Sequence, residues 1–232
     1  MECKSIKHTD TYGGIDGFRI VAALLIVAIH TGPLASYTEI GDFLLTRVVA
    51  RVAVPFFLMA TGFFLIPRLL EKKDGVLRKY LSKTSLLYAV SILLYLPVMI
   101  YAGYFRGDSV WRKFLPDLFF NGPFYHLWYL PGAMLGMCIV ALLVKRCRPG
   151  TLFIITGGLY LIGLFGDSYF GLIETTPVIS DIYGALFQVS DYTRNGVFFA
   201  PLFLWLGGWI ALRKKSPGKI FGQMCIRDRV IY

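Results

Sequence analysis

Six long apolar runs occupy most of the sequence and restrict what the chain can fold into. Hydrophobic residues make up 56% of the chain and charged residues only 16%, which is atypical of soluble globular domains. About 17 to 25 apolar residues cross a bilayer as a helix. We therefore predict an all-α fold, a polytopic transmembrane helical bundle of about six spans. The runs are 18–35, 43–66, 84–101, 124–144, 151–166 and 196–212, of which the fifth, with Gly157 and Gly158, is the weakest.

Basic residues cluster in alternate loops and so predict the orientation of the spans. Loops rich in Lys and Arg stay on the cytoplasmic side. The amino terminus is therefore predicted to be cytoplasmic. The clustered residues are Arg68, Lys72, Lys73, Arg78, Lys79 and Lys83, then Lys145, Arg146 and Arg148, and finally Arg213, Lys214, Lys215 and Lys219. The opposite loops are mainly acidic, with one basic exception at 105–120, which we expect to lie along the outer interface as a short amphipathic segment.

The remaining composition argues against several other classes of function. The formal charge of +10 is confined to short clusters between apolar runs, so nucleic acid is not an expected partner. The four cysteines have no paired spacing, and no metal-ligand pattern is present in the sequence. We expect no bound cofactor or metal.

Two polar residues interrupt the first apolar run. Arg19 and His30 are eleven residues apart, which returns to within roughly 20° of the same helix face, about 16 Å further along the axis. A titratable group in hydrocarbon costs several kcal/mol unless it faces protein or water. One reading is a polar cavity lined by both residues. The alternative is an Arg19 that extends to the interface and a His30 that only packs.

Four further residues are candidates for substrate binding. Arg47 and Arg51 are one helical turn apart in the second run. Two arginines within a membrane span carry a large free-energy cost unless they face a water-filled cavity or bind an anion. His126 begins the fourth run, and its alternative role is an interfacial residue beside aromatic anchors. Arg194 precedes the sixth run, and its alternative is a loop charge paired with Asp191.

Four motifs carry a resemblance to a known family. They are Arg19 and His30 after the lead Ile15-Asp16, and the stretches 51–62, 126–130 and 193–201. In this order they resemble the membrane acyltransferase-3 family, and within it the membrane domain of the membrane-bound serine racemases of glycopeptide resistance. The resemblance covers most of 14–212.

The resemblance implies a multi-pass plasma-membrane O-acyltransferase. His30 would be the general base and Arg19 its essential motif partner, with a cytoplasmic acyl-CoA as donor. The acyl group, expected to be acetyl, would go to a hydroxyl of a cell-envelope glycan or another small acceptor, beside membrane lipid. The alternative is a transport or binding module for a small amino acid, L-serine, attached to a serine racemase. Binding roles for Arg47, Arg51, His126 and Arg194 are our own extrapolation.

The end of the chain breaks the pattern. After Gly222 the sequence neither continues a span nor fits the family. We expect residues 1–222 to be an incomplete acyltransferase-3-like transmembrane domain and 223–232 to be a non-native tail.

Overall fold

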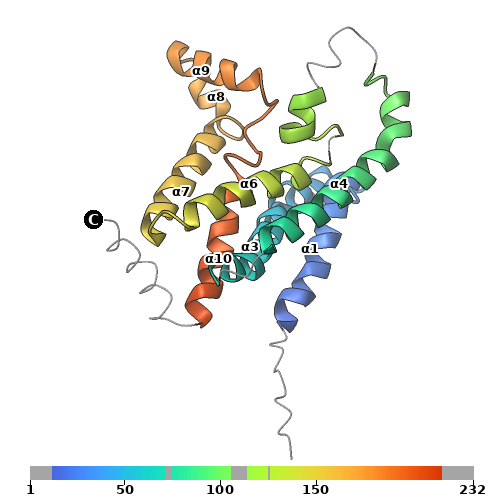
Figure 1. The fold of residues 1–232 in the computed structure, drawn as a ribbon. Helices are drawn as coiled ribbons and strands as arrows, with labels where there is room; N and C mark the ends of the chain where they lie inside the picture. Colours follow the sequence, from blue (N-terminus) through green and yellow to red (C-terminus); the bar gives the residue numbers. More distant parts are fainter. Residues whose placement is uncertain (1–11, 72–74, 106–113, 125, 216–232) are drawn as a thin grey trace, which may run out of the picture. The chain divides into compact units, whose positions relative to one another are not determined.

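A computed structural model describes residues 12–71, 75–105, 114–124 and 126–215 (Figure 1). All regular secondary structure in these residues is helical, which confirms the predicted all-α class. The chain divides into two compact units, Met1–Phe57 and Leu58–Tyr232. The boundary falls inside helix α3, Ala53–Leu70.

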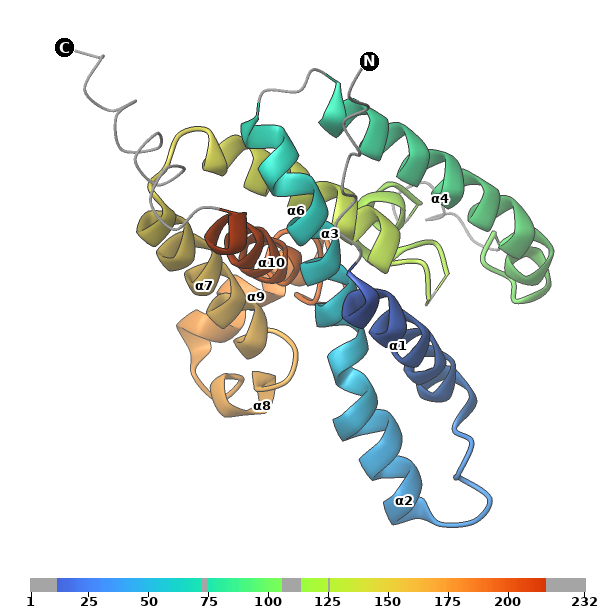
Figure 2. The same ribbon diagram turned by 90° about the horizontal axis from the view of Figure 1, so that it is seen from below.

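The first unit is a helical hairpin (Figure 2). Helix α1, Gly13–Thr31, packs against a second helical stretch that follows a short loop. The second stretch comprises α2 (Glu39–Phe43), the π-helical η1 (Leu44–Val49), the 3-10 turn η2 (Ala50–Val52) and the start of α3. Small side chains allow the two arms to approach closely, because Ala22, Ala50 and Ala53 are all completely buried.

Local hydrogen bonds close the turn of this hairpin. Gly32 caps α1 with φ 54°, a left-handed conformation that glycine adopts without strain, and its N–H donates to the Ala28 carbonyl. The Asp42 carboxylate accepts the N–H of Leu34 at 3.1 Å. Thr38 caps α2 by accepting the N–H of Gly41 at 3.3 Å. The turn that follows His30 therefore has a defined geometry.

The second unit is a bundle built around α10, Ala200–Lys215, which packs against α6 and α7. Trp205 and Leu204 of α10 are completely buried. Gly62 lies directly against the Leu204 carbonyl, leaving no room for a side chain. The other elements of this unit are α4 (Val76–Tyr101), η3 (Asp117–Asn121), α6 (Tyr129–Val144), α7 (Pro149–Phe165), α8 (Phe170–Ile173) and α9 (Pro177–Phe187).

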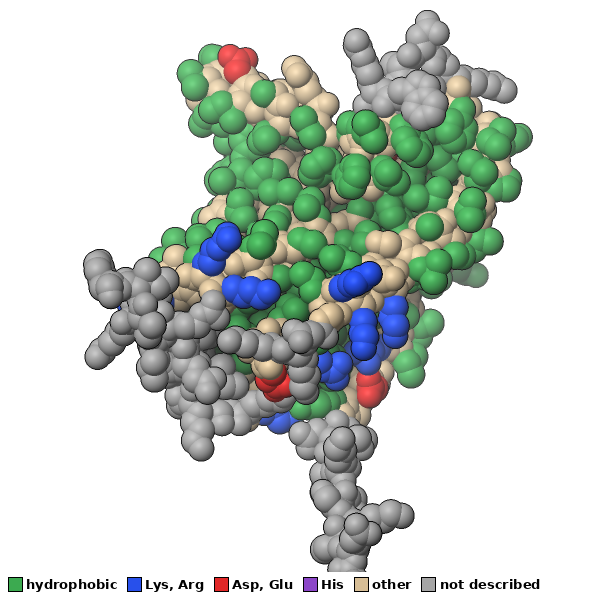
Figure 3. Space-filling model, in the orientation of Figure 1, with side chains coloured by type: hydrophobic (Ala, Val, Ile, Leu, Met, Phe, Trp, Pro, Cys, Tyr) green, Lys and Arg blue, Asp and Glu red, His purple; other side chains and the backbone are tan. Residues whose placement is uncertain are grey.

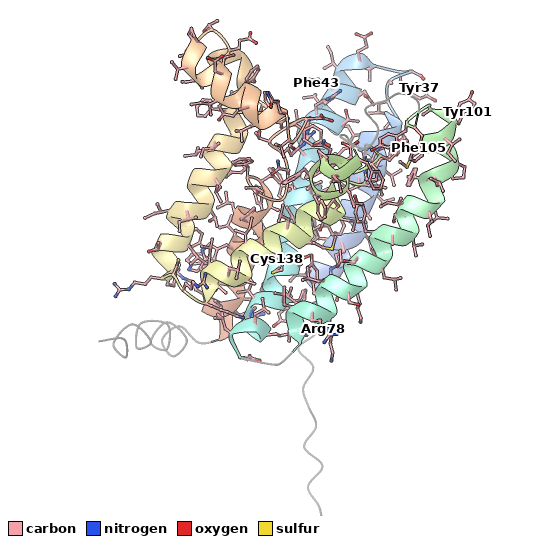
Figure 4. The ribbon with its side chains drawn as sticks, turned by 45° about the horizontal axis from the view of Figure 1, so that its top comes forward. Tyr37, Phe43, Arg78, Tyr101, Phe105 and Cys138 are labelled. Atoms are coloured by element: carbon pink, nitrogen blue, oxygen red, sulfur yellow. The ribbon has the colours of Figure 1, made fainter. Side chains whose placement is uncertain are left out.

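Side-chain contacts fix the directions of these helices. Helix α4 runs antiparallel to α6, because Ser85 lies beside Met134 and Tyr95 stacks on Phe124 with ring centroids 4.7 Å apart. Helix α7 runs antiparallel to α10, with Phe153 against Trp209 at one end and Gly163 against Phe198 at the other. Arg78 and Tyr101 mark the two ends of α4 in Figure 4.

These directions bring the basic clusters of the second unit to one end. The end of α3, the start of α4, the α6–α7 turn and the end of α10 share it. The described basic residues there are exposed: Arg68, Arg78, Lys79, Lys83, Lys145, Arg146, Arg148, Arg213 and Lys214. Figure 3 shows Lys and Arg side chains gathered on one part of the surface, with hydrophobic side chains over most of the rest. Their common location fits one cytoplasmic side, and the absolute orientation stays a prediction.

Each of the six predicted runs coincides with a helix of the described chain, including the weak fifth run, which is α7. Within the described residues, three helical stretches are long and apolar enough to span a bilayer: Gly13–Thr31, Glu39–Leu70 and Val76–Tyr101. Six spans therefore stay a prediction. Helix α9 lies where we expected a loop. Of the predicted interfacial segment 105–120, residues 106–113 lie outside the described residues, and η3 begins near its end.

Candidate functional site

Arg19 and His30 both lie on α1, as predicted. The Arg19 guanidinium forms an ion pair with the Asp16 carboxylate at 2.6 Å, and both side chains are about half exposed. His30 occupies the last turn of α1 and is exposed. The regular helix between them separates the two residues by about 16 Å. One small group cannot contact both side chains, whereas an extended ligand, or one that moves along the helix, can reach each of them.

Arg47 and Arg51 lie on the other arm of the same hairpin. Phe18 and Phe56 meet edge-on with ring centroids 4.6 Å apart, and this contact sets the alignment of the arms. Counting nine residues from that contact along each arm brings Arg47 to about the level of Val27. Counting five brings Arg51 to about the level of Ala23. At about 1.5 Å per residue, His30, Arg47, Arg51 and Arg19 follow one another at intervals of about 4 to 6 Å.

The local geometry around these arginines differs from the regular α-helix assumed in the sequence argument. Arg47 lies in the π-helical η1 and Arg51 in the 3-10 turn η2. The neighbouring Thr46 and Ala50 take the buried positions, and both arginines are exposed. Single π-helical turns within α-helices are frequent at functional sites. We refer to His30, Arg47, Arg51 and Arg19 as the cation ladder.

The two remaining candidates lie in the second unit, at the end opposite the basic clusters. His126 lies in the turn before α6, edge-on to the rings of Phe124 at 5.6 Å and Tyr95 at 6.5 Å. Its Nδ1 atom is buried, and burial lowers the pKa of His126 below its usual value. These contacts match the interfacial aromatic role that we considered as the alternative.

Arg194 lies against two aromatic rings. Its guanidinium carbon lies 5.5 Å from the Trp128 ring centroid and 5.6 Å from that of Tyr192. Its Nε atom is buried and has no hydrogen-bond partner among the described residues. The alternative pairing with Asp191 is wrong, since no ion pair joins these two described residues.

A buried polar network that we did not predict holds the loop carrying Arg194. Asn121 accepts the N–H of Asp191 at 3.0 Å through its side-chain oxygen, and its backbone carbonyl accepts the Tyr192 hydroxyl at 3.1 Å. The Ser190 hydroxyl lies 3.0 Å from the same side-chain oxygen. Asn195 donates to the Ser190 oxygen at 3.2 Å. We call Asn121, Ser190, Tyr192 and Asn195 the amide network.

The amide network is anchored on both sides. Asn121 donates to one Asp117 oxygen at 2.9 Å, while the Tyr104 hydroxyl donates to the other at 2.6 Å. Burial and the Asp117 carboxylate raise the pKa of Tyr104. The Thr193 hydroxyl donates to the Gly163 carbonyl at 2.6 Å and so ties the loop to α7. The network is therefore rigidly placed, as satisfied buried polar groups are.

Comparison with known proteins identifies the family. A model described as an acyltransferase domain matches residues 12–219. The chain belongs to the acyltransferase-3 family. The predicted membership is thus confirmed, and it supports a membrane protein of acyltransferase type. No solved structure matches the chain.

Three curated relatives are named racemases. Two are amino-acid racemases of Enterococcus faecalis, 48% identical over 95% of this chain and 42% identical over 91%. The third is a serine/alanine racemase of Enterococcus gallinarum, 40% identical over 92%. The chain spans about a third of the length of each, with 32%, 31% and 31% of the relatives covered. These matches fit the predicted resemblance to the membrane domain of serine racemases.

Proposed function

We propose that the chain is the membrane part of an amino-acid racemase and that it binds a small amino acid, such as L-serine, and moves it across the membrane. The racemase names of three relatives that match more than nine-tenths of the chain carry this proposal. A domain that delivers the substrate would give a racemase a reason to be attached to the membrane.

The cation ladder supports this role physically. A carboxylate that enters a bilayer loses its hydration, so it needs positive partners along its path. His30, Arg47, Arg51 and Arg19 occur at successive levels of the first unit. The levels follow one another at about 4 to 6 Å along the helix axes, so an anionic group that moved along the hairpin would meet a cation at each level.

Uptake of radiolabelled L-serine by cells tests the proposal. Cells whose own serine uptake has been deleted should accumulate L-serine when they produce the chain. The double variant Arg47→Gln/Arg51→Gln should lose most of this uptake at unchanged membrane abundance. Arg146→Gln is the matched control, because Arg146 is exposed in the turn that follows α6 and lies outside the ladder. Absence of uptake by the unaltered chain at normal abundance would overturn the proposal.

Acyl transfer is the second candidate function, and membership of the acyltransferase-3 family favours it. In this reading, the His30 imidazole removes the proton from an acceptor hydroxyl. The hydroxyl oxygen attacks the thioester carbonyl of acyl-CoA, the carbon–sulfur bond breaks, and coenzyme A leaves as the thiol once it takes up a proton. An exposed imidazole at the end of α1 suits a general base. Arg19, about 16 Å away, would hold another part of the long donor.

Release of coenzyme A thiol measures this second function. The purified chain in vesicles receives acetyl-CoA and a cell-envelope glycan fraction. His30→Ala should lower the rate by about 10²- to 10⁴-fold without lowering the amount of folded protein. Arg19→Lys should be milder than Arg19→Ala, because lysine keeps the positive charge. Full activity in His30→Ala would remove the catalytic role.

A further inference from the structure

We infer that Arg194 binds the carboxylate of the amino-acid substrate at the end of the second unit opposite the basic clusters. This inference rests on the proposed binding of an amino acid, and it names the residue that would recognise the ligand. The described residues leave the guanidinium without a hydrogen-bond or ion-pair partner. A cation in this state has its donors available for an anion.

The surroundings of Arg194 hold it in place without using those donors. Trp128 and Tyr192 contact the guanidinium through their ring faces, at 5.5 and 5.6 Å from the ring centroids. Such contacts orient the planar group and leave its N–H groups in the plane free to donate. The Tyr192 ring is itself fixed, because its hydroxyl donates to the Asn121 carbonyl. Arg194 is therefore pre-organised for an anion.

The two acidic residues joined to the amide network through Asn121 do not neutralise Arg194. Asp117 uses one oxygen for Tyr104 and the other for Asn121. Asp191 donates its N–H to Asn121 and makes no ion pair with Arg194. Because no carboxylate of the described residues pairs with the Arg194 guanidinium, this charge favours a carboxylate supplied by the ligand.

The location at this end also suits capture of a substrate. The loop 190–195 precedes α10, and Trp128 precedes α6, so both lie at the starts of helices that end among the basic clusters. If the basic clusters are cytoplasmic, Arg194 faces the outer side. A small amino acid arriving from outside would reach this arginine without crossing the membrane.

Binding of two matched ligands tests the inference. L-serine carries a carboxylate, and L-serine methyl ester has the same side chain without that charge. Isothermal titration calorimetry on the purified chain in detergent should show that L-serine binds about 10- to 100-fold more tightly, the range expected of charge-assisted hydrogen bonds. Arg194→Gln should abolish this preference. Arg194→Lys should keep only part of it, since lysine has no planar fork.

The preference between the two ligands separates recognition from folding, because a merely structural defect would weaken both ligands alike. Arg213→Gln is the matched control. Arg213 stacks on Trp209 at 4.0 Å but lies at the basic end, so its loss should leave the preference unchanged.

Three results would overturn the inference. They are no binding of L-serine to the unaltered chain, an unchanged preference in Arg194→Gln, and loss of coenzyme A binding in that variant while L-serine binding stays. Uptake by cells is measured separately. If Arg194→Gln keeps both the uptake of L-serine and the preference for L-serine over its methyl ester, the carboxylate role of Arg194 is refuted and transport is not. If the unaltered chain binds L-serine but cells that produce it take up none, transport is refuted and the carboxylate role is not.

Discussion

The two units of the molecule hold their candidate residues in opposite ways. In the first unit, His30, Arg47 and Arg51 are exposed on a hairpin whose buried side chains are small. In the second unit, Asn121, Ser190 and Asn195 are buried and joined by hydrogen bonds that cross about 70 residues of sequence. The first arrangement leaves charged groups accessible to a ligand, and the second fixes one arginine in place.

This difference teaches where each unit obtains its stability. The first unit relies on local bonds, such as the Thr46 hydroxyl donating to the Asp42 carbonyl within the same helical stretch at 2.8 Å. The second relies on contacts between distant segments, which include close helix packing at Gly62 and the amide network. Substitutions in the second unit should therefore cost more.

The largest effect is expected at the α3–α10 contact. A Cβ on Gly62 would overlap the Leu204 backbone carbonyl, and neither backbone can move without separating the helices. Gly62→Ala should strongly reduce the amount of folded protein, because overpacking costs about 1 to 3 kcal/mol and more where the backbone must shift. Fluorescence size-exclusion chromatography of detergent-extracted membranes measures this loss.

Gly17→Ala in the first unit is the matched control for Gly62→Ala. Gly17 lies inside α1, and no atom beyond its chain neighbours and the adjacent helix backbone lies within 4 Å of the place that a Cβ would take. Alanine should therefore be neutral or stabilise the helix by up to about 1 kcal/mol. Equal losses in the two variants would refute the contrast between the units.

The sequence predicted the features that depend on the polarity of single residues. The apolar runs became helices, and the basic clusters share one end of the second unit. Arg194 was chosen as a candidate because a charge before an apolar run is conspicuous, and its binding role stays a prediction. Its pairing with Asp191 was wrong, because the Asp191 N–H is used by Asn121 and the Arg194 side chain is held by two aromatic rings instead.

The amide network was missed for a physical reason. Asn121, Ser190 and Asn195 are neutral, short and common in loops, so nothing in their local sequence distinguishes them from solvated residues. Their contacts depend on the fold of α6, α7 and α10. Helix α9 was missed because the acidic residues Glu174 and Asp181 were interpreted as loop charges. The π-helical turns at 44–49 and 117–121 have no comparable signature in the sequence.

A smaller effect is expected from Asn121→Ala. The substitution leaves the Asp117 carboxylate, the Ser190 hydroxyl and the Asp191 N–H without one partner each. The Ser190 hydroxyl keeps the Tyr192 carbonyl as a partner, the Asp117 carboxylate keeps the Tyr104 hydroxyl, and Asp191 is exposed. The free energy of unfolding should therefore fall by about 1 to 3 kcal/mol, the cost of one unsatisfied buried polar group. Denaturant unfolding in mixed micelles measures it.

Thr46→Val in the first unit is the matched control for Asn121→Ala. It removes one local side-chain hydrogen bond within a helical stretch and preserves shape, so the loss should stay below about 1 kcal/mol. A cost at Thr46 as large as that at Asn121 would show that the hairpin also depends on buried polar contacts.

The smallest expected effect is a pH dependence of thermal stability that distinguishes His126 from His30, the two histidines among the described residues. Burial lowers the pKa of His126, so the unfolded chain binds a proton more readily than the folded chain. The stabilisation from this difference is complete above the unfolded pKa of about 6.5 and is lost as the pH falls toward the lower folded value. Thermal unfolding in detergent should therefore occur at a lower temperature at pH 5 than at pH 7. His126→Gln should reduce this shift, whereas His30→Gln, at an exposed position of α1, should retain it. The reverse pattern, with the pH shift removed by His30→Gln and kept by His126→Gln, would place the pH-sensitive histidine in the hairpin. It would contradict the claim that burial of His126 in the second unit causes the shift.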